Sequence, residues 1–516
     1  MIQWSTKKIS HALSLLIFNF TICLSQEKIK EIEFSADRIK YVQEIKGGAQ
    51  RLIGNVQFIH EGVIITCDSA YRFDNNSIEA YDHIMIRKGD SLRITGDKLA
   101  YDGNTKLAKI QGKVLCVEKD MTLSTDELNF DVKKSIASYY NGGTITSKNN
   151  TLKSKHGYYD SPSKMLSFRY GVVLQNPEYK MECDTLKYHT LSKIAYFLGP
   201  TTINSKKNKL FCENGWYNTT TEKCMISKNA KIESMPNTLS SDSLFYDRKL
   251  GYGKAYSRVV LSDTTQKFIL KGNLAETFEK KGISIFSQNP KLIQPLKKDT
   301  LYLKADSIVS YENRFVIKQG EKKITIDSSS IKLFHSIRFF KKDLMGMADS
   351  AVYTYSDSSL NLFKSPVIWS DSSQATAKTI KIITTKNNVK YMELLGNAFF
   401  ILMEDSLKFN QLSGKTVKAF FKNDSLDRII LSGNAKAIYY MKNEKKKFIG
   451  VNQTECKEIR ASFKKGGALK NVSFLDKPSS KITPIADSDP EKLRLKGFIW
   501  LEKYKPKNKE EILLQP

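Results

Sequence analysis

Glycine, proline and tryptophan are scarce in this chain. Its 516 residues include 27 glycines, 12 prolines and 4 tryptophans. This content excludes a collagen-like protein and a proline-rich linker protein. Hydrophobic residues still make up 41% of the chain, with 24 tyrosines and 27 phenylalanines, which excludes wholesale disorder. The composition predicts a folded protein rich in β-structure.

Motifs for catalysis, cofactors and metals are also lacking. The sequence has no P-loop, no GxGxxG, no GxSxG and no HExxH. No two cysteines form a CxxC pair, and cysteine and histidine do not recur with the spacing of a zinc site. We therefore expect that the protein is not an enzyme and holds no cofactor and no metal.

The first residues, 1–25, have the architecture of a secretory signal peptide. Two lysines precede an almost wholly apolar stretch at residues 12–24. We expect cleavage after Ser25; a lipid anchor on Cys23 is the alternative, which the bulky residue before it disfavours. No later stretch approaches the roughly 20 apolar residues of a membrane helix. The sequence thus predicts an exported protein that is soluble or peripheral to a membrane.

Basic residues outnumber acidic residues by 82 to 54, which gives a formal charge of +28. Such a surface suits phosphate-bearing partners, whether nucleic acid or anionic lipid. A lysine-rich genome would give the same excess without any partner. Because export separates the protein from nucleic acid, we expect lipid phosphates as the partner and no nucleic acid.

Four columns of residues recur along the first half of the chain, almost always in steps of 29. One column is aromatic and contains Tyr101, Phe130, Tyr159, Tyr188, Tyr217 and Tyr246. The other three are Ile65, Ile94, Leu123, Leu152, Met181, Leu210 and Leu239; Tyr81, Ile110, Tyr139, Phe168, Phe197 and Ile226; and Cys116, Ile145, Leu174, Ile203, Ile232 and Leu261. Four columns in one register indicate a structural repeat, in which each unit buries its apolar edge against the next.

Within each repeat, apolar and polar residues alternate, and Asp, Asn, Lys and Gly mark turns. Three strands of about five residues, with their turns, would fill one period. We therefore predict an all-β fold: an elongated β-solenoid or folded β-sheet groove, built as a stack of short strands with about 29 residues per rung. The apolar columns would form its inner wall.

The repeat keeps its phase up to Leu261 and then loses it, although similar segments persist. Gly396-Asn-Ala and Gly433-Asn-Ala, for example, echo Gly54-Asn-Val. We expect four parts, namely a signal peptide at 1–25, a β-repeat domain at 26–262, a less regular repeat region of the same kind at 263–475, and a mostly irregular tail at 476–516 that serves as a cap or docking segment.

Two polar patterns follow the repeat. An acid recurs just before the aromatic column, and we interpret it as a structural residue that accepts hydrogen bonds near a turn, because acids in single file lack the converging oxygens of a cation site. Cys183 and Cys212 lie 29 residues apart, so adjacent rungs would bring them within disulfide range, with unbridged burial as the alternative. The recurring acids are Asp68, Asp97, Asp126, Asp184, Glu213 and Asp242, with Lys155 in the one interrupted position.

Short motifs in residues 32–82 form a recognisable series: Ile32-Glu-Phe-Ser-Ala-Asp37 with Tyr41, then Gly54-Asn-Val56, then Asp68, then Ala80-Tyr-Asp82. This series resembles the organic solvent tolerance (OstA-like) domain, which the periplasmic lipopolysaccharide transport protein and the soluble part of the outer-membrane translocon share. The resemblance implies a taco-shaped antiparallel β-jellyroll that shelters lipid A acyl chains. It also implies a periplasmic location, in association with the outer membrane or free, and partners in an inner-membrane transport complex and an outer-membrane translocon, joined through sheet edges.

We therefore expect a non-enzymatic protein that carries lipopolysaccharide, or a related anionic glycolipid, during outer-membrane assembly. Two alternatives stay open: a closed β-helix that serves as a structural or adhesive rod, and a polysaccharide-active β-helix enzyme. The candidate lipid-binding residues are taken from the columns and are Ile94, Leu123, Leu152, Met181, Ile110, Tyr139, Phe168 and Phe197.

Overall fold

The computed structural model describes residues 31–514, except 46–47, 91, 207, 266, 297–298, 320–321, 386–387, 423–424 and 465–468. The chain divides after Lys133 into two compact units, called unit 1 and unit 2 below. The predicted signal peptide lies outside the described residues. None of the helices in the described part is long and apolar enough to cross a membrane.

Unit 1 consists of strands joined by short turns. They are β1 (Glu33–Ser35), β2 (Arg38–Val42), β3 (Ala49–His60), β4 (Val63–Phe73), β5 (Ser77–Lys88), β6 (Leu92–Asp102), β7 (Leu107–Glu118) and β8 (Met121–Asp131).

Unit 2 contains the other strands and four single-turn helices. The first strands are β9 (Ile136–Tyr139), β10 (Gly143–Ser147), β11 (Asn150–Ser154), β12 (His156–Asp160), β13 (Met165–Gln175), β14 (Tyr179–His189), β15 (Ile194–Ser205), β16 (Lys209–Asn218), β17 (Lys223–Ser234), β18 (Asn237–Asp247), β19 (Tyr252–Asp263) and β20 (Phe268–Phe278). After η1 (Glu279–Lys281) come β21 (Ile283–Ser287), β22 (Lys291–Pro295), β23 (Thr300–Lys304), β24 (Ser307–Tyr311), β25 (Arg314–Gln319), β26 (Lys322–Asp327), β27 (Ser330–Lys341), β28 (Leu344–Thr354), β29 (Ser359–Phe363), β30 (Val367–Ser370), β31 (Ser373–Thr376) and β32 (Thr379–Thr385). The last elements are β33 (Asn388–Met403), β34 (Phe409–Lys422), β35 (Ser425–Lys442), β36 (Phe448–Phe463), β37 (Leu469–Leu475), β38 (Ser479–Pro484), η2 (Ile485–Asp487), η3 (Glu502–Tyr504) and α1 (Glu510–Leu513).

Both units are built from antiparallel strands, so the taco-like form of the predicted all-β fold is confirmed. The prediction of three short strands per repeat is wrong. One period holds two long strands; β3 to β8, for example, have 11 or 12 residues each. Each strand pairs with the next one along the chain, as β5 does with β6 and β17 with β18.

Every second long strand bends sharply in its middle. At each bend the pairing register shifts, for instance between Ile53 and Val56 of β3. The two residues at the bend, Gly54 and Asn55, have φ values of +80° and +43°. Such a pair of left-handed residues is a β-bulge that turns the strand. We call this pair of residues a corner. In a strand with a corner, the half before the corner is the first arm and the half after it is the second arm. Residues of the strands without a corner belong to the arm with which they pair.

Corners recur throughout both units. The Gly-Asn pairs at 396–397 and 433–434 have positive φ values of +75° and +54° and of +82° and +52°, close to those of the pair at 54–55. The sequence echo of these segments therefore reflects a shared backbone geometry. Other corners use different residues, including Asp82-His83, Lys228-Asn229 and Ser257-Arg258.

The corners fold the sheet, and the space between its two arms is the core. In β7, for example, Ala108 and Ile110 of the first arm are buried, as is Val114 of the second arm, while Leu115 on the opposite face is 44% exposed. Alternate residues of both arms thus point inward, as strand geometry requires.

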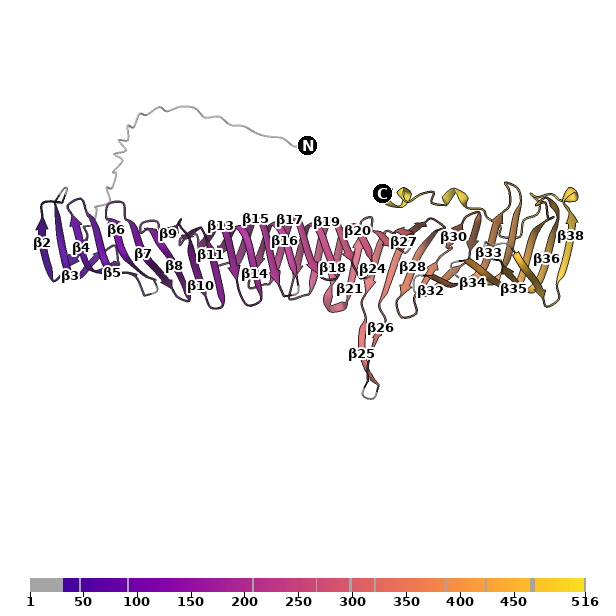
Figure 1. Ribbon diagram of the computed structural model, residues 1–516, viewed down its shortest axis with the longest axis horizontal. Coiled ribbons are helices and arrows are strands. Elements are labelled where there is room, and N and C mark those ends of the chain that lie inside the picture. The colour runs from indigo at the N-terminus through magenta and orange to yellow at the C-terminus, as the bar shows by residue number, and fades with distance from the viewer. Residues whose placement is uncertain are drawn as a thin grey trace, which may run out of the picture. The chain divides into compact units, whose positions relative to one another are not determined.

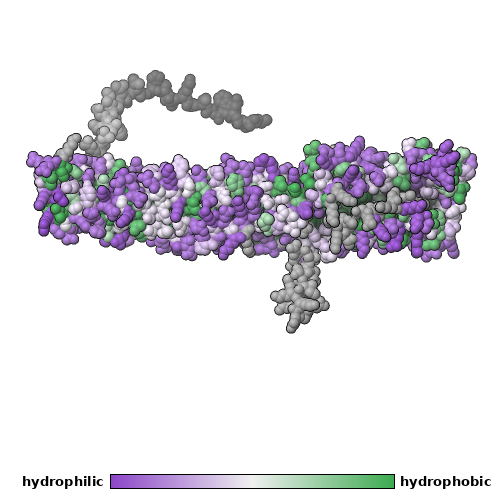
Figure 2. Space-filling model, in the orientation of Figure 1, coloured by the Kyte–Doolittle hydropathy of each residue, from purple (hydrophilic) through white to green (hydrophobic). Residues whose placement is uncertain are grey.

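Unit 2 departs from the short period after β24. The hairpin β25–β26 is a separate two-stranded sheet inserted between β24 and β27 (Figure 1). Further on, β33 and β36 reach 16 residues and β35 reaches 18. The hairpin and the longer strands explain why the 29-residue phase is lost in the second half. Figure 2 shows that the visible surface of unit 2 is mostly hydrophilic, with hydrophobic residues in scattered groups.

The corners generate a stability prediction. Gly112 has φ +80°, and a Cβ there would lie 2.5 Å from Asp97 Oδ2 and 2.8 Å from Asp97 Cβ. Gly89 also has a positive φ, +60°, but a Cβ there meets no atom within 4 Å. Both Gly→Ala substitutions incur left-handed strain of about 1 kcal/mol, and Gly112→Ala adds overpacking of about 1–3 kcal/mol. Urea unfolding should therefore show a larger loss in the free energy of unfolding for Gly112→Ala than for Gly89→Ala. Equal losses in the two variants would contradict the corner geometry.

Candidate functional site

Two rows of apolar side chains line the space between the arms of unit 1. In the second arm, Cys116 is paired with both Ile94 and Leu123. In the first arm, Ile110 is paired with both Leu99 and Leu128. The two rows belong to different predicted columns, and the fold brings both to the same interior.

Unit 2 continues both kinds of row over many strands. The second-arm row consists of Ile145, Leu152, Leu174, Met181, Ile203, Leu210, Ile232, Leu239 and Leu261, each paired with the next. The first-arm row consists of Tyr139, Gly157, Phe168, Leu186, Phe197, Gly215, Ile226, Leu244 and Ala255. We call the space between these two rows the trough.

All eight candidate lipid-binding residues belong to these rows. Seven of them are buried and Leu123 is half-buried. Ile94, Ile110 and Leu123 lie in unit 1. Tyr139, Leu152, Phe168, Met181 and Phe197 lie in unit 2.

The glycines of the first-arm row do not leave empty space. A Cβ on Gly157 would lie 2.2 Å from the Tyr139 ring, and one on Gly215 would lie 2.2 Å from the Phe197 ring. Each glycine faces its aromatic residue directly across the strand pair. An aromatic ring therefore fills the place of each missing side chain.

In unit 1 the far ends of the two arms contact each other. His60, the last residue of β3, lies with its Nδ1 2.7 Å from the hydroxyl of Tyr101 near the end of β6, and both side chains are 4% exposed. Burial raises the pKa of Tyr101 to about 12. Lys106 also forms an ion pair with Glu61 at 3.3 Å. These contacts hold the arms of unit 1 together on the side opposite the corners.

The recurring acids bind side chains at the corners. Asp68 Oδ2 lies 2.6 Å from His83 Nδ1, and Asp242 Oδ1 accepts a hydrogen bond from Arg258 Nε at 2.7 Å. The hydrogen bond and charge of Asp68 raise the pKa of His83. In the described part of the chain, no three His, Cys, Asp or Glu side chains are grouped to hold a metal. The contacts support the structural interpretation of the acids, although their partners are corner side chains.

Cys183 and Cys212 do not lie on adjacent strands. Cys183 pairs with Thr201 of β15, and Thr201 in turn pairs with Cys212. One strand therefore separates the two cysteines, which places them roughly 10 Å apart, beyond disulfide reach. Both are buried free thiols. Of the two alternatives, the bridge is wrong, because each 29-residue period contributes two strands, and unbridged burial is confirmed.

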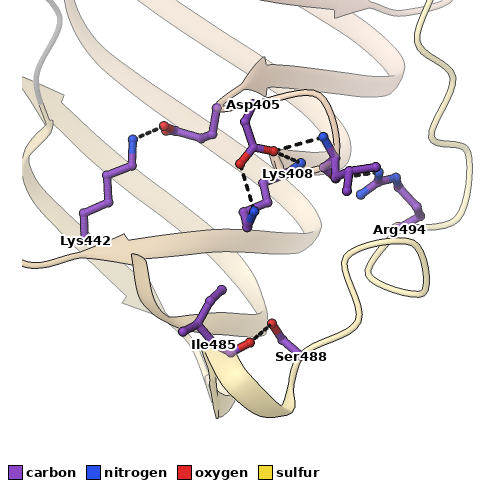
Figure 3. A network of polar contacts seen from close by, with 8 residues as sticks. Asp405, Lys408, Lys442, Ile485, Ser488 and Arg494 are labelled. Atoms are coloured by element: carbon purple, nitrogen blue, oxygen red, sulfur yellow. Dashed lines mark hydrogen bonds and ion pairs between the residues drawn. The ribbon is translucent and has the colours of Figure 1, made fainter. Parts of the chain in front are cut away.

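The C-terminal segment from Ile485 to Leu514 packs on the outer face of unit 2. Leu495, Phe498 and Trp500 cover a buried cluster formed by Phe399, Ile401 and Phe409. The Arg494 guanidinium lies 4.8 Å from the Phe409 ring centroid and 4.7 Å from that of Phe498. Figure 3 shows Arg494 beside the Asp405–Lys408 pair, which is 2.8 Å long, and Ser488 donating to the Ile485 carbonyl at 2.8 Å.

Two buried glutamines hold this segment. Gln374 donates to the Ile499 carbonyl at 2.7 Å and accepts from the Leu501 amide at 2.7 Å. Gln411 binds Leu493 and Leu495 in the same way, at 2.8 Å each. Each side-chain amide thus forms the two hydrogen bonds to the tail backbone that a neighbouring strand would otherwise form. The tail predicted as irregular is therefore a docked segment, and its first residues form β38.

Comparisons with known proteins find similarity to a protein family and to a solved structure. A family model described as OstA-like protein matches residues 28–184 and 181–242. No curated protein matches the chain. A solved structure that matches is LptH of Pseudomonas aeruginosa, titled the LptA homologous periplasmic component of the lipopolysaccharide transport device; it shares 16% identity over 21% of this chain and 81% of its own, with a TM-score of 0.20. The match to the OstA-like family confirms the expectation that the chain is not an enzyme.

The arm contact of unit 1 can be tested by removing one hydroxyl. Tyr101→Phe leaves His60 buried without this partner, and we expect a loss of about 1–3 kcal/mol in the free energy of unfolding. Tyr41→Phe is the control, because Tyr41 is 64% exposed. Thermal and urea unfolding measure both variants; a Tyr101→Phe protein as stable as the control would show that the contact does not hold the arms.

The cysteines give a second test. Burial raises the pKa of Cys183 and of Cys212 to about 12, so both thiols should resist alkylation in the folded protein at neutral pH. In denaturant without reductant, both should be alkylated completely. Mass spectrometry of tryptic peptides measures the labelling, and a peptide pair joined by a Cys183–Cys212 bridge would contradict the strand order.

Proposed function

Residues 28–242 of this chain belong to the OstA-like family, and from that premise we propose that the protein is a carrier of lipopolysaccharide or a related anionic glycolipid. The acyl chains would lie in the trough, between the two arms. The observation that carries this proposal is the pair of continuous apolar rows in unit 2, which extend from Tyr139 and Ile145 to Ala255 and Leu261. A row without polar interruption suits the aliphatic part of a lipid.

The proposed location and partners follow from the same premise. We place the protein in the periplasm, exported by the signal at residues 1–25, as part of outer-membrane assembly. An inner-membrane transport complex and an outer-membrane translocon would bind through sheet edges. Strand β2, which pairs with β3, exposes Ile39 by 55% and Tyr41 by 64%, and offers such a surface. We also propose residues 26–262 and 263–475 as two repeat regions of this carrier, followed by the docked tail.

Lipid binding requires the arms to separate. Phe168 is 3% exposed and Phe197 is 2% exposed without any ligand. An acyl chain can reach them only when the opposite arm moves away and the chain takes its place. The same burial, together with the His60–Tyr101 contact, favours a second candidate function: a closed structural rod whose core is complete without lipid.

In-cell photocrosslinking separates the two candidates. A photoreactive residue in place of Phe168 or Phe197 should attach to lipopolysaccharide, as mass analysis of the adduct would show. Tyr196 is the matched control, because it neighbours Phe197 on the opposite face of β15 and is 37% exposed; Lys206 is a second, exposed control. Lipid adducts at Phe168 or Phe197, without adducts at the two control positions, would support transport. Adducts only within the protein would contradict the carrier function and favour the closed rod.

A further inference from the structure

Four cations form one cross-strand row in unit 2. Lys271 of β20 pairs with Lys291 of β22, Lys291 pairs with Lys304 of β23, and Lys304 pairs with Arg338 of β27. Neighbouring strands lie about 4.8 Å apart, so the row spans roughly 14 Å. A ligand with more than one anionic group can therefore contact several of these cations at once.

The row lies on the outer face of the folded sheet. Leu270, Leu303 and Phe339 are the chain neighbours of three of the cations, and they are buried in the interior at 7%, 7% and 4% exposure. Because successive side chains of a strand point to opposite faces, the cations point outward. Lys291, Lys304 and Arg338 are nevertheless only half-exposed.

Such a row is unfavourable without a counter-ion. Like charges directly opposite each other on paired strands destabilise a sheet. Elsewhere in unit 2, lysines face acids across the pairing: Lys209 faces Glu233, Lys223 faces Asp247, Lys254 faces Glu276, Lys418 faces Glu393 and Lys436 faces Glu455.

The four cations have no carboxylate partner among the described residues. No ion pair joins Lys271, Lys291, Lys304 or Arg338 to an acid in that part of the chain. Burial lowers the pKa of Lys291. Burial and then the charges of Arg338 and Lys291 lower the pKa of Lys304, although Asp306 partly opposes them. The positive charge of the row is thus concentrated, and Asp306 offsets it only in part.

The docked C-terminal segment forms a wall beside the row. Helix α1 contacts β23 and β27, and its Ile512 is fully buried. Lys291 Nζ donates a hydrogen bond to the carbonyl of Leu513. The C-terminal segment therefore lies against one side of the row and holds one of its cations, Lys291, in place.

We propose that this cation row binds the phosphate groups of an anionic glycolipid. Phosphates offer charge and several acceptor oxygens in a compact group, which lysine and arginine bind through charge-assisted hydrogen bonds. The site rests on the proposed function for the choice of a lipid ligand. Free phosphate shares the same chemistry, and the test separates the two sources.

The test uses the full chain and two double variants with the same change in net charge. Lys291→Gln/Lys304→Gln removes the centre of the row. Lys254→Gln/Lys436→Gln is the control, because these lysines are paired with Glu276 at 3.3 Å and Glu455 at 2.6 Å. The probes are phosphatidylcholine vesicles with and without bisphosphorylated lipid A, and inorganic pyrophosphate. Melting temperatures establish that each variant folds.

We expect the affinity for lipid A vesicles to fall at least tenfold in the row variant and less than threefold in the control, with no binding to phosphatidylcholine alone. Equal losses of affinity in both variants would show that the vesicles bind to diffuse surface charge and not to this row, which would overturn the proposal. Pyrophosphate that binds as tightly as the lipid A vesicles would overturn the lipid assignment.

Crosslinking at Phe168, in the row variant and in the control variant, separates failure of the cation site from failure of the carrier function. Lipid attached at Phe168, together with unchanged vesicle affinity in the row variant, overturns the cation site alone. Absence of lipid at Phe168, together with a tenfold loss of vesicle affinity in the row variant, overturns the trough as carrier and leaves the cation site standing.

Discussion

The left-handed residues at the corners of every second long strand are the constraint on which the rest of this structure depends. A sheet of long strands without corners would expose one face to water; with them, the two arms bury each other. Left-handed backbone at a residue other than glycine, as at Asp82 or Ser257, costs about 1 kcal/mol. Each buried inward side chain contributes roughly 1.5–3 kcal/mol, so the two arms of one strand more than offset a corner. Contacts such as Asp242 with Arg258 then hold the corner side chains.

The sequence predicts which residues are buried better than it predicts the number and length of the strands. The apolar columns indicate which residues face inward, and Ile110, Phe168 and Phe197 are buried as expected. The strand count fails because a corner uses the residues that mark a loop: Lys228-Asn229 in the middle of β17 reads as a turn between strands. The same miscount produced the false Cys183–Cys212 bridge, since strand β15 lies between the two cysteines.

The sequence analysis expects a tail that caps or docks, but it does not identify the face that the tail covers, although the sequence carries a signal for that face. Strands with one wet face alternate polar and apolar residues, whereas strands covered on both faces read as continuous apolar runs. Val367-Ile-Trp369 and Ala398–Met403 are such runs, in contrast to the alternating strands of unit 1. What no pattern indicated is the pair Gln374 and Gln411, because buried glutamines are recognised only when their partners, the backbone groups of the tail, are placed beside them.

An interior that is already packed sets the energetics of a carrier. Opening the arms exposes side chains whose burial contributes roughly 1.5–3 kcal/mol each, and every acyl methylene that enters restores about 0.8 kcal/mol, so roughly two to four methylenes replace one side chain. The rows of unit 2 are continuous. When a lipid moves along them by one strand, the arms separate ahead of it and close behind it, so the net change in free energy is small. Apolar contact can therefore hold a lipid in the trough without giving it a direction. In the proposed carrier, direction would therefore come from outside the trough, through a partner that supplies energy at one end.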